Sequence, residues 1–365
     1  MKAASGRPTP TAALCMALIA FCSLATAPVQ EPAGPATPEQ EVRALAERWK
    51  TALEGLDARG AIALYAQDFL LGGTTRTGHW RAYWGQLERM RRMHVRLTVE
   101  PLVQKVELWR FEGSRTVEFA DIELVVHYKQ QWDSQRRARR FACPVRLRRE
   151  GAQWKACGDQ LRTACTLQVG YDGQHYMLTL TAASAWPSFP NKARLKGAGL
   201  EAISLRRKGR DAYGRPYVTE TAYLPTRPAI GAAYMFQIPY KNGNENVPCA
   251  VRGTVDVIPA ITEPRAEAPV TQWPLGVSWQ DVSARVKDFS NYEVHVRRPG
   301  DNAALWVMRS IPADQTQVTI GETRQEQAAL AGYGSIRLEV YALDIYGNYG
   351  VARRGVRLPA AAGAD

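Results

Sequence analysis

The sequence predicts a multidomain protein in which an α+β cone, made of three helices on a bent antiparallel sheet, precedes two all-β sandwiches. Apolar residues recur with helical spacing up to residue 92, and they alternate with the period of a β-strand between residues 95 and 157. Only short β-rich runs separated by Gly, Pro and Asn follow residue 161. At 365 residues the chain is also too long for one ordinary core.

The first helix has the clearest start signal. Thr37 can cap it, Pro38 can begin it, and Gln40 can return a hydrogen bond as in a capping box. Asp57 can cap a second, shorter helix, and a third is expected near residues 78–92, where arginines in the last turn suit the helix dipole. The apolar face of the first helix is formed by Val42, Leu45, Ala46, Trp49, Ala52, Leu53 and Leu56.

The strand pattern that follows contains one change of parity. Val117 and Phe119 fall on odd positions, whereas the apolar residues that follow fall on even positions, namely Ile122, Leu124, Val126 and Tyr128. A β-bulge at Ala120 and Asp121 would keep both halves facing the core. We therefore expect Phe119 to face the interior and Asp121 to lie at the bulge.

Two all-β units are expected after residue 161. Residues 162–258 read as a β-sandwich, residues 259–274 as a linker rich in Pro and Ala, and residues 275–358 as a second sandwich, with a tail at 359–365.

The N-terminal segment is typical of a secretory signal. Lys2 and Arg7 precede an uncharged run that ends in small residues, which predicts a signal peptide at 1–27 and a Pro-rich linker at 28–36. Attachment to lipid through Cys22 is the rival interpretation, but the bulky Phe21 before it is unfavourable. We expect an exported protein, periplasmic or extracellular, with no transmembrane segment because no later run is apolar for long enough.

The formal net charge of +12 narrows the classes of partner. Basic runs at residues 136–140 and 206–210 could bind anionic lipid head groups or acidic polysaccharide, although solvated turns are the simpler interpretation. Nucleic acid is not expected, because an exported protein rarely meets it and no recognition motif is present.

Four cysteines follow the signal peptide, and an even number in an oxidising compartment predicts two disulfides with three possible pairings. Cys165 and Cys249 bracket the middle unit, and Cys143 and Cys157 lie on strands joined by a turn. Regular alternation places Cys143 and Cys157 on opposite faces, so their pairing would need a bulge.

Residues 37–161 resemble the nuclear transport factor 2-like superfamily, which includes SnoaL-like polyketide cyclases, ketosteroid isomerase and scytalone dehydratase. The resemblance rests on the order of Trp49-Lys-Thr-Ala-Leu, residues 63–69, residues 80–92 and Gly151-Ala-Gln-Trp-Lys. It implies a cone-shaped domain with a pocket under the helices and a possible homodimer through the outer face of the sheet. In residues 275–358, the strand-like Trp279, the turn Tyr341-Ala-Leu-Asp-Ile-Tyr-Gly-Asn and the number of expected strands resemble a fibronectin type III domain, which implies a spacer or adhesion module.

The resemblance places a candidate pocket inside the cone, and enzymes of this superfamily use a carboxylate or imidazole whose pKa is shifted by an apolar cavity. The alternative catalytic candidates are Asp68, Asp121 and His127, none of which falls on a catalytic motif. Core packing is the competing interpretation for the aromatic side chains. The candidate ligand-binding residues are Trp49, Tyr65, Asp68, Trp80, Trp84 and Phe119.

Strong catalytic and metal motifs are missing from the sequence. It contains no GxSxG, phosphate loop, HExxH or CxxC, so no metal or cofactor is expected. We therefore favour an exported, non-catalytic binding or scaffold protein of the bacterial cell envelope, with a small ligand, an envelope polymer or a protein as partner. The alternative is a small-molecule isomerase, dehydratase or hydrolase that acts in the cone pocket.

Overall fold

The computed structural model describes residues 36–358, except for gaps at 111, 114–117, 134, 187, 198–199, 212–213, 267–269, 271 and 301–302. The expected signal peptide, nearly all of the expected Pro-rich linker and the expected tail lie outside the described residues. Within the described part the chain is mostly β-structure, arranged in one large mixed sheet and several smaller sheets.

The three predicted helices are confirmed in the first unit, and their caps explain where they begin. Thr37 Oγ1 accepts a hydrogen bond from the backbone N–H of Gln40 at 3.3 Å, and the Thr37 N–H donates to Gln40 Oε1 at 2.8 Å. Asp57 accepts from the first N–H groups of the second helix. The helices are α1 (Pro38–Glu54), α2 (Ala58–Ala63) and α3 (Arg76–Arg92).

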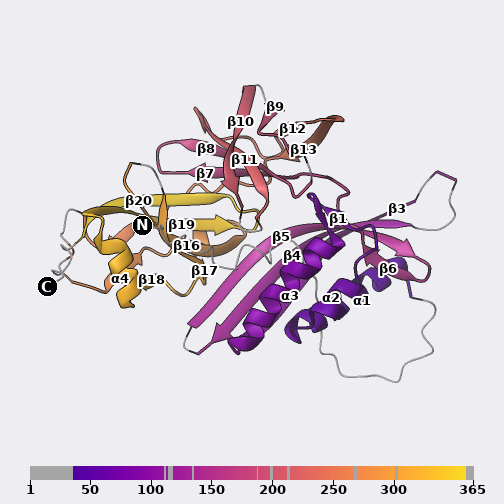
Figure 1. Ribbon diagram of the computed structural model, residues 1–365, viewed down its shortest axis with the longest axis horizontal. Helices are drawn as coiled ribbons and strands as arrows, with labels where there is room; N and C mark the ends of the chain where they lie inside the picture. Colours follow the sequence, from indigo (N-terminus) through magenta and orange to yellow (C-terminus); the bar gives the residue numbers. More distant parts are fainter. Residues whose placement is uncertain are drawn as a thin grey trace.

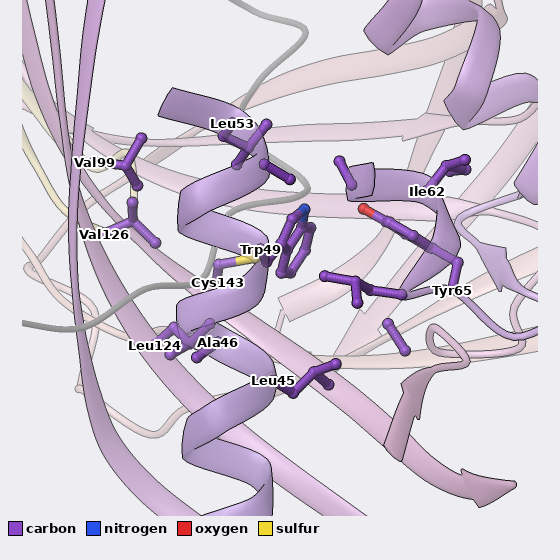
Figure 2. Close-up of a cluster of buried hydrophobic side chains, with 14 of the residues drawn as sticks. Leu45, Ala46, Trp49, Leu53, Ile62, Tyr65, Val99, Leu124, Val126 and Cys143 are labelled. Carbon is purple, nitrogen blue, oxygen red and sulfur yellow. The ribbon is translucent and has the colours of Figure 1, made fainter. Parts of the chain in front are cut away.

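The strands of this unit form a two-stranded ribbon and a four-stranded antiparallel sheet of order β3-β4-β5-β6. The helices lie along one face of the larger sheet (Figure 1). Figure 2 shows α1 at the centre of the buried cluster, with Trp49 beside Cys143 and on the side of Tyr65. The strands are β1 (Leu70–Leu71), β2 (Thr74–Thr75), β3 (Arg96–Trp109), β4 (Phe119–Trp132), β5 (Gln135–Glu150) and β6 (Gln153–Ala156).

The predicted bulge at Ala120 and Asp121 is wrong. Strand β4 pairs with β5 without a shift over its whole length, and the irregularity lies in β3 between Val103 and Lys105. Because alternation in β4 is unbroken, Ala120 is buried in the core, whereas Phe119 and Asp121 face the opposite side of the sheet.

The middle unit is one curled sheet where two packed layers were expected. Its strand order is β13-β12-β9-β10-β11-β8-β7, and the first and last of these strands contact each other, so the sheet wraps around its own core. The strands are β7 (Ala164–Tyr171), β8 (Tyr176–Ala183), β9 (Lys192–Gly197), β10 (Leu200–Arg210), β11 (Pro216–Leu224), β12 (Ala233–Tyr240) and β13 (Gly243–Ala250).

The C-terminal unit packs two sheets around a third core. Strands β20-β19-β16-β17 continue the middle sheet through a short parallel pairing of β20 with β7, and β14-β15-β18 form a separate sheet. The elements are β14 (Ile261–Glu263), β15 (Leu275–Trp279), η2 (Ser283–Arg285), β16 (Phe289–Arg297), β17 (Ala304–Ile311), β18 (Gln317–Ile320), α4 (Arg324–Ala331), β19 (Ser335–Asp344) and β20 (Tyr349–Arg357).

Two details of this unit differ from the sequence expectation. Part of the expected linker forms β14, whose Ile261 is buried in the C-terminal core. Helix α4 was not predicted, although Thr323 and Glu326 form a capping box that marks its start.

The first and C-terminal units meet along the edge of β5 that β6 does not cover. The Ala142 N–H donates to the carbonyl oxygen of Ile345 at 2.8 Å, and the hydroxyl of Ser290 donates to the carbonyl oxygen of Arg140. Arg252, which follows the middle unit, pairs with Glu123 on the outer face of β4. The face through which a homodimer was expected is therefore covered in part by the same chain.

Candidate functional site

The interior under the helices is filled by aromatic side chains. Trp49 and Tyr65 are only 2% and 3% exposed, and their rings meet edge to face with centroids 5.5 Å apart. Phe69 packs against Tyr65 with centroids at 4.5 Å. Core packing is thus the observed role of the two candidate ligand-binding residues that point inward (Figure 2).

His79 was missed as an interior residue. It lies on α3 one turn before Tyr83, and its ring packs edge to face on Phe69 with centroids 4.8 Å apart. Its Nε2 atom is buried without a hydrogen-bond partner. Burial lowers the pKa of His79 to about 4, and nearby Arg215 acts in the same direction, so the imidazole is neutral near pH 7. The spacing of His79, Tyr83 and Leu87 on one helical face was the available signal.

The other aromatic candidates lie at the edge of this interior or outside it, and of these only Trp80 is partly buried and packed against the core. Trp80 and Trp84 stack on each other along α3 with centroids 5.6 Å apart, and Trp84 is 42% exposed. Phe119 stacks on Trp109 at 4.3 Å on the outer face of the sheet. The six candidate ligand-binding residues therefore do not line one pocket.

The candidate carboxylates are engaged with arginines. Arg148 donates two hydrogen bonds to Asp68 at 2.8 and 2.7 Å, which lowers the pKa of the Asp68 carboxyl. Arg146 donates two to Asp121 at 2.7 and 2.9 Å. A carboxylate fixed in this way is a structural ion pair. For Asp68 the lowered pKa is the opposite of the raised pKa that proton transfer near neutrality requires.

In the part of the chain that the structure describes, none of the four cysteines expected to pair forms a disulfide. Cys143 belongs to the core under the helices, whereas Cys157 lies beside the backbone of Arg146, so the two occupy opposite faces as alternation requires. Burial raises the pKa of Cys165, and the proximity of Cys249 raises it further. Pairing of Cys165 with Cys249 stays a prediction.

The structure brings basic side chains together at a different place, a groove between the first sheet and the C-terminal unit. It has a volume of about 720 Å³. We call it the basic groove; its charged or imidazole-bearing lining from β3, β4 and β5 comprises Arg96, His127, Lys129, Arg136, Arg137 and Arg140, and its opposite wall comprises 283–284, 289–290 and 312–314.

Strand register explains why several of these side chains converge. In antiparallel strands, directly opposed residues share a face. Gln131 of β4 is opposed by Arg96 on β3 and by Arg136 on β5, and His127 is opposed by Arg140. These rows lie on the outer face of the sheet, so the alternative catalytic candidate His127 belongs to the groove and lies on the opposite face of the sheet from the expected cone pocket.

Positive charge in the basic groove is only partly neutralised. Arg136 pairs with Asp314 at 2.7 Å, and Lys129 pairs with Glu100 at 2.7 Å. Arg96 and Arg140 form no ion pair with any residue that the structure describes; Arg140 donates to the carbonyl oxygen of Phe289 at 3.4 Å. A recess of this kind concentrates positive potential and attracts anions.

His127 adds little charge to the groove at neutral pH. Its Nδ1 atom lies 3.3 Å from Glu100 Oε2. Burial lowers the pKa of His127, and nearby Lys129 acts in the same direction, which outweighs the opposing effect of Glu100. The imidazole therefore offers hydrogen bonds more than charge.

Among the residues described, no group of three or more His, Cys, Asp or Glu side chains is arranged to hold a metal ion. In the same part of the chain, no helix is both long and apolar enough to cross a membrane. No protein-family model matches the chain, and no curated protein matches it.

Proposed function

We propose that the chain is an exported, non-catalytic binding protein of the bacterial cell envelope that holds an acidic polymer in the basic groove. Its first unit would be a nuclear transport factor 2-like domain, and its C-terminal unit a fibronectin type III-like domain. Three helices on one face of a four-stranded antiparallel sheet, and a C-terminal core between two sheets, support these assignments.

The observation that carries the proposal is the unbalanced charge of the groove. Asp314 is the one carboxylate among the described residues that line it, against five Arg or Lys side chains. Gathering like charges in a recess costs free energy that an anionic ligand recovers on binding. Because two units of the chain form the walls, binding would also hold these units together.

The geometry gives less support to proton transfer in the first unit. Asp68 is held ionised by Arg148, Asp121 is paired with Arg146, and His127 faces the outer side of the sheet. The interior that would enclose a substrate is occupied by Trp49 and Tyr65.

The proposal is tested by the affinity of the purified full chain for fluorescently labelled polygalacturonate, a linear polymer of carboxylate sugars. The test variant is Arg96→Gln/Arg136→Gln, and the control is Arg48→Gln/Arg59→Gln, which removes the same charge from exposed positions on α1 and α2. Two surface contacts worth about 0.5–1 kcal/mol each predict about five- to thirtyfold weaker binding for the test variant.

Salt gives a second readout of the same complex. Binding should weaken as ionic strength rises, since exposed charges are screened over about 8 Å at physiological salt. Equal affinity of the test and control variants, or binding that ignores salt, would remove the groove as the binding site.

A further inference from the structure

A second cationic surface lies on the outer face of the middle unit. Strands β9, β10, β12 and β13 border a hollow of about 460 Å³. Its cations are Lys192 and Arg194 of β9 and Arg206 of β10, and no carboxylate is among the described residues that line it. We call these three side chains the β9 cationic face.

The arrangement of these cations is unfavourable in the absence of a ligand. Lys192 and Arg206 are directly opposed in the β9–β10 pairing, and like charges at such positions destabilise a sheet. None of the three cations forms an ion pair with any residue of the described chain, in contrast to Arg215, which is paired with Asp211 at 2.8 Å. Three exposed, unneutralised cations around one hollow indicate a site for an external anion.

The spacing of the charges favours a linear partner. Lys192, Arg194 and Lys196 alternate with the buried residues Ala193 and Leu195, so their side chains emerge on one face of β9. A strand rises about 3.3 Å per residue, which places successive cations roughly 7 Å apart in a row. Such a row matches a chain with repeated negative charges better than a single small anion.

The neutral polar residues that line the hollow favour a sugar as the ligand. Besides the cations, the hollow is lined by Ser204, Gln237 and Asn244. Hydroxyl and amide groups both donate and accept hydrogen bonds, as sugar hydroxyls require of a partner. Arg194 is directly opposed by Ser204 on one side and by Gln237 on the other, so a cation and two neutral hydrogen-bonding groups stand in one row across three strands.

We propose that the β9 cationic face is a second binding site, for a linear acidic polysaccharide. The inference rests on the proposed function and deepens it, because one polymer chain held at both the basic groove and the β9 cationic face would bind more tightly than at either alone. Linking two sites in this way raises the apparent affinity through a higher effective concentration.

The test is isothermal titration of the full chain with short oligogalacturonate, and with a heparin oligosaccharide as the sulfated counterpart. The variants are Lys192→Gln/Arg194→Gln, the groove variant Arg96→Gln/Arg136→Gln and the control Arg48→Gln/Arg59→Gln. Circular dichroism and thermal unfolding of every variant check that it is folded; the exposed positions chosen predict that it will be.

The control should bind two oligosaccharides per chain. Lys192→Gln/Arg194→Gln, which we call the β9 variant, and the groove variant should each bind one. With a long polygalacturonate chain, the β9 variant should bind about tenfold more weakly than the control. If the β9 variant keeps both the stoichiometry and the long-chain affinity of the control while the groove variant is impaired, the second site is refuted and the proposed function survives.

Other outcomes are equally decisive. If the groove variant also matches the control, the proposed function fails. Binding of the β9 cationic face to anionic phospholipid vesicles or duplex DNA, but to neither oligosaccharide, would overturn the assignment to polysaccharide.

Discussion

The buried imidazole of His79 predicts that the first unit loses stability in mild acid. The folded chain holds His79 with a pKa of about 4, against an ordinary value of 6.5. Protonation is therefore easier in the unfolded chain, so the stability present above pH 6.5 is lost as the pH falls towards 4. Linkage with these two values gives a loss of about 2.5 kcal/mol between pH 7.5 and pH 4.5.

The variant that tests this is His79→Leu, which removes the imidazole and keeps a side chain of similar size. Because His79 Nε2 has no hydrogen-bond partner and a leucine is of similar size, the substitution should change stability by less than about 1.5 kcal/mol at pH 7.5. At pH 4.5 the variant should lack the acid-induced loss. A missing acid-induced loss would identify the His79 imidazole as its source, even if the substitution itself changes stability at pH 7.5.

The assay must report on the first unit alone, because a chain of several units need not unfold in one step. Peptide-resolved hydrogen exchange over α1 and α3, corrected for the intrinsic effect of pH on exchange, meets this need. It also separates His79 from Asp344 of the C-terminal unit, whose pKa burial raises to about 6 and whose effect on stability has the opposite sign. Equal pH dependence in wild type and His79→Leu would refute the reasoning.

Three further predictions follow from packing and pairing. Trp49→Ala should destabilise the first unit by about 3–5 kcal/mol, measured by the same hydrogen exchange, since it empties the centre of the core; a change below about 1 kcal/mol would contradict that placement. Asp68→Asn should cost the first unit less than about 1 kcal/mol, measured by the same hydrogen exchange, because its pair with Arg148 is exposed; a larger loss would point to a role beyond the ion pair. Mild oxidation should link Cys165 to Cys249, seen as a joined peptide by mass spectrometry, because β7 and β13 are in contact; if both thiols stay free, the predicted disulfide is wrong.

The helices of the first unit were predictable because each begins with a local signal. Caps at Thr37 and Asp57 act over a few residues and are visible in the sequence. The same kind of signal marks α4, where Thr323 and Glu326 form a capping box, but α4 is short and its neighbouring runs are β-rich.

The facing of β4 was mispredicted for a reason that local pattern cannot reveal. Phe119 is apolar yet lies on the outer face, where it stacks on Trp109 of the neighbouring strand. An apolar side chain on the outer face, such as Phe119, makes the apolar residues switch between odd and even positions in the sequence although the strand keeps its register. Only the neighbouring strand, which supplies Trp109, distinguishes an outward-facing Phe119 from a bulge in β4.

The sequence predicts that a cationic surface exists, but it does not predict where the basic groove lies. The run at 136–140 signalled a cationic surface, but its opposite wall comes from residues about 150 or more positions later. Juxtaposition of such distant segments depends on how the units pack, for example through Ala142 and Ile345, and no periodicity in the sequence encodes it.

The most direct test of the groove is a hydrogen-exchange footprint of the full chain with saturating oligogalacturonate. Peptides that cover residues 95–98, 127–131 and 135–140 should gain protection together with those covering 283–290 and 311–315, because these segments form the two walls. Protection confined to α3 around Trp84, with both walls unchanged, would contradict the account.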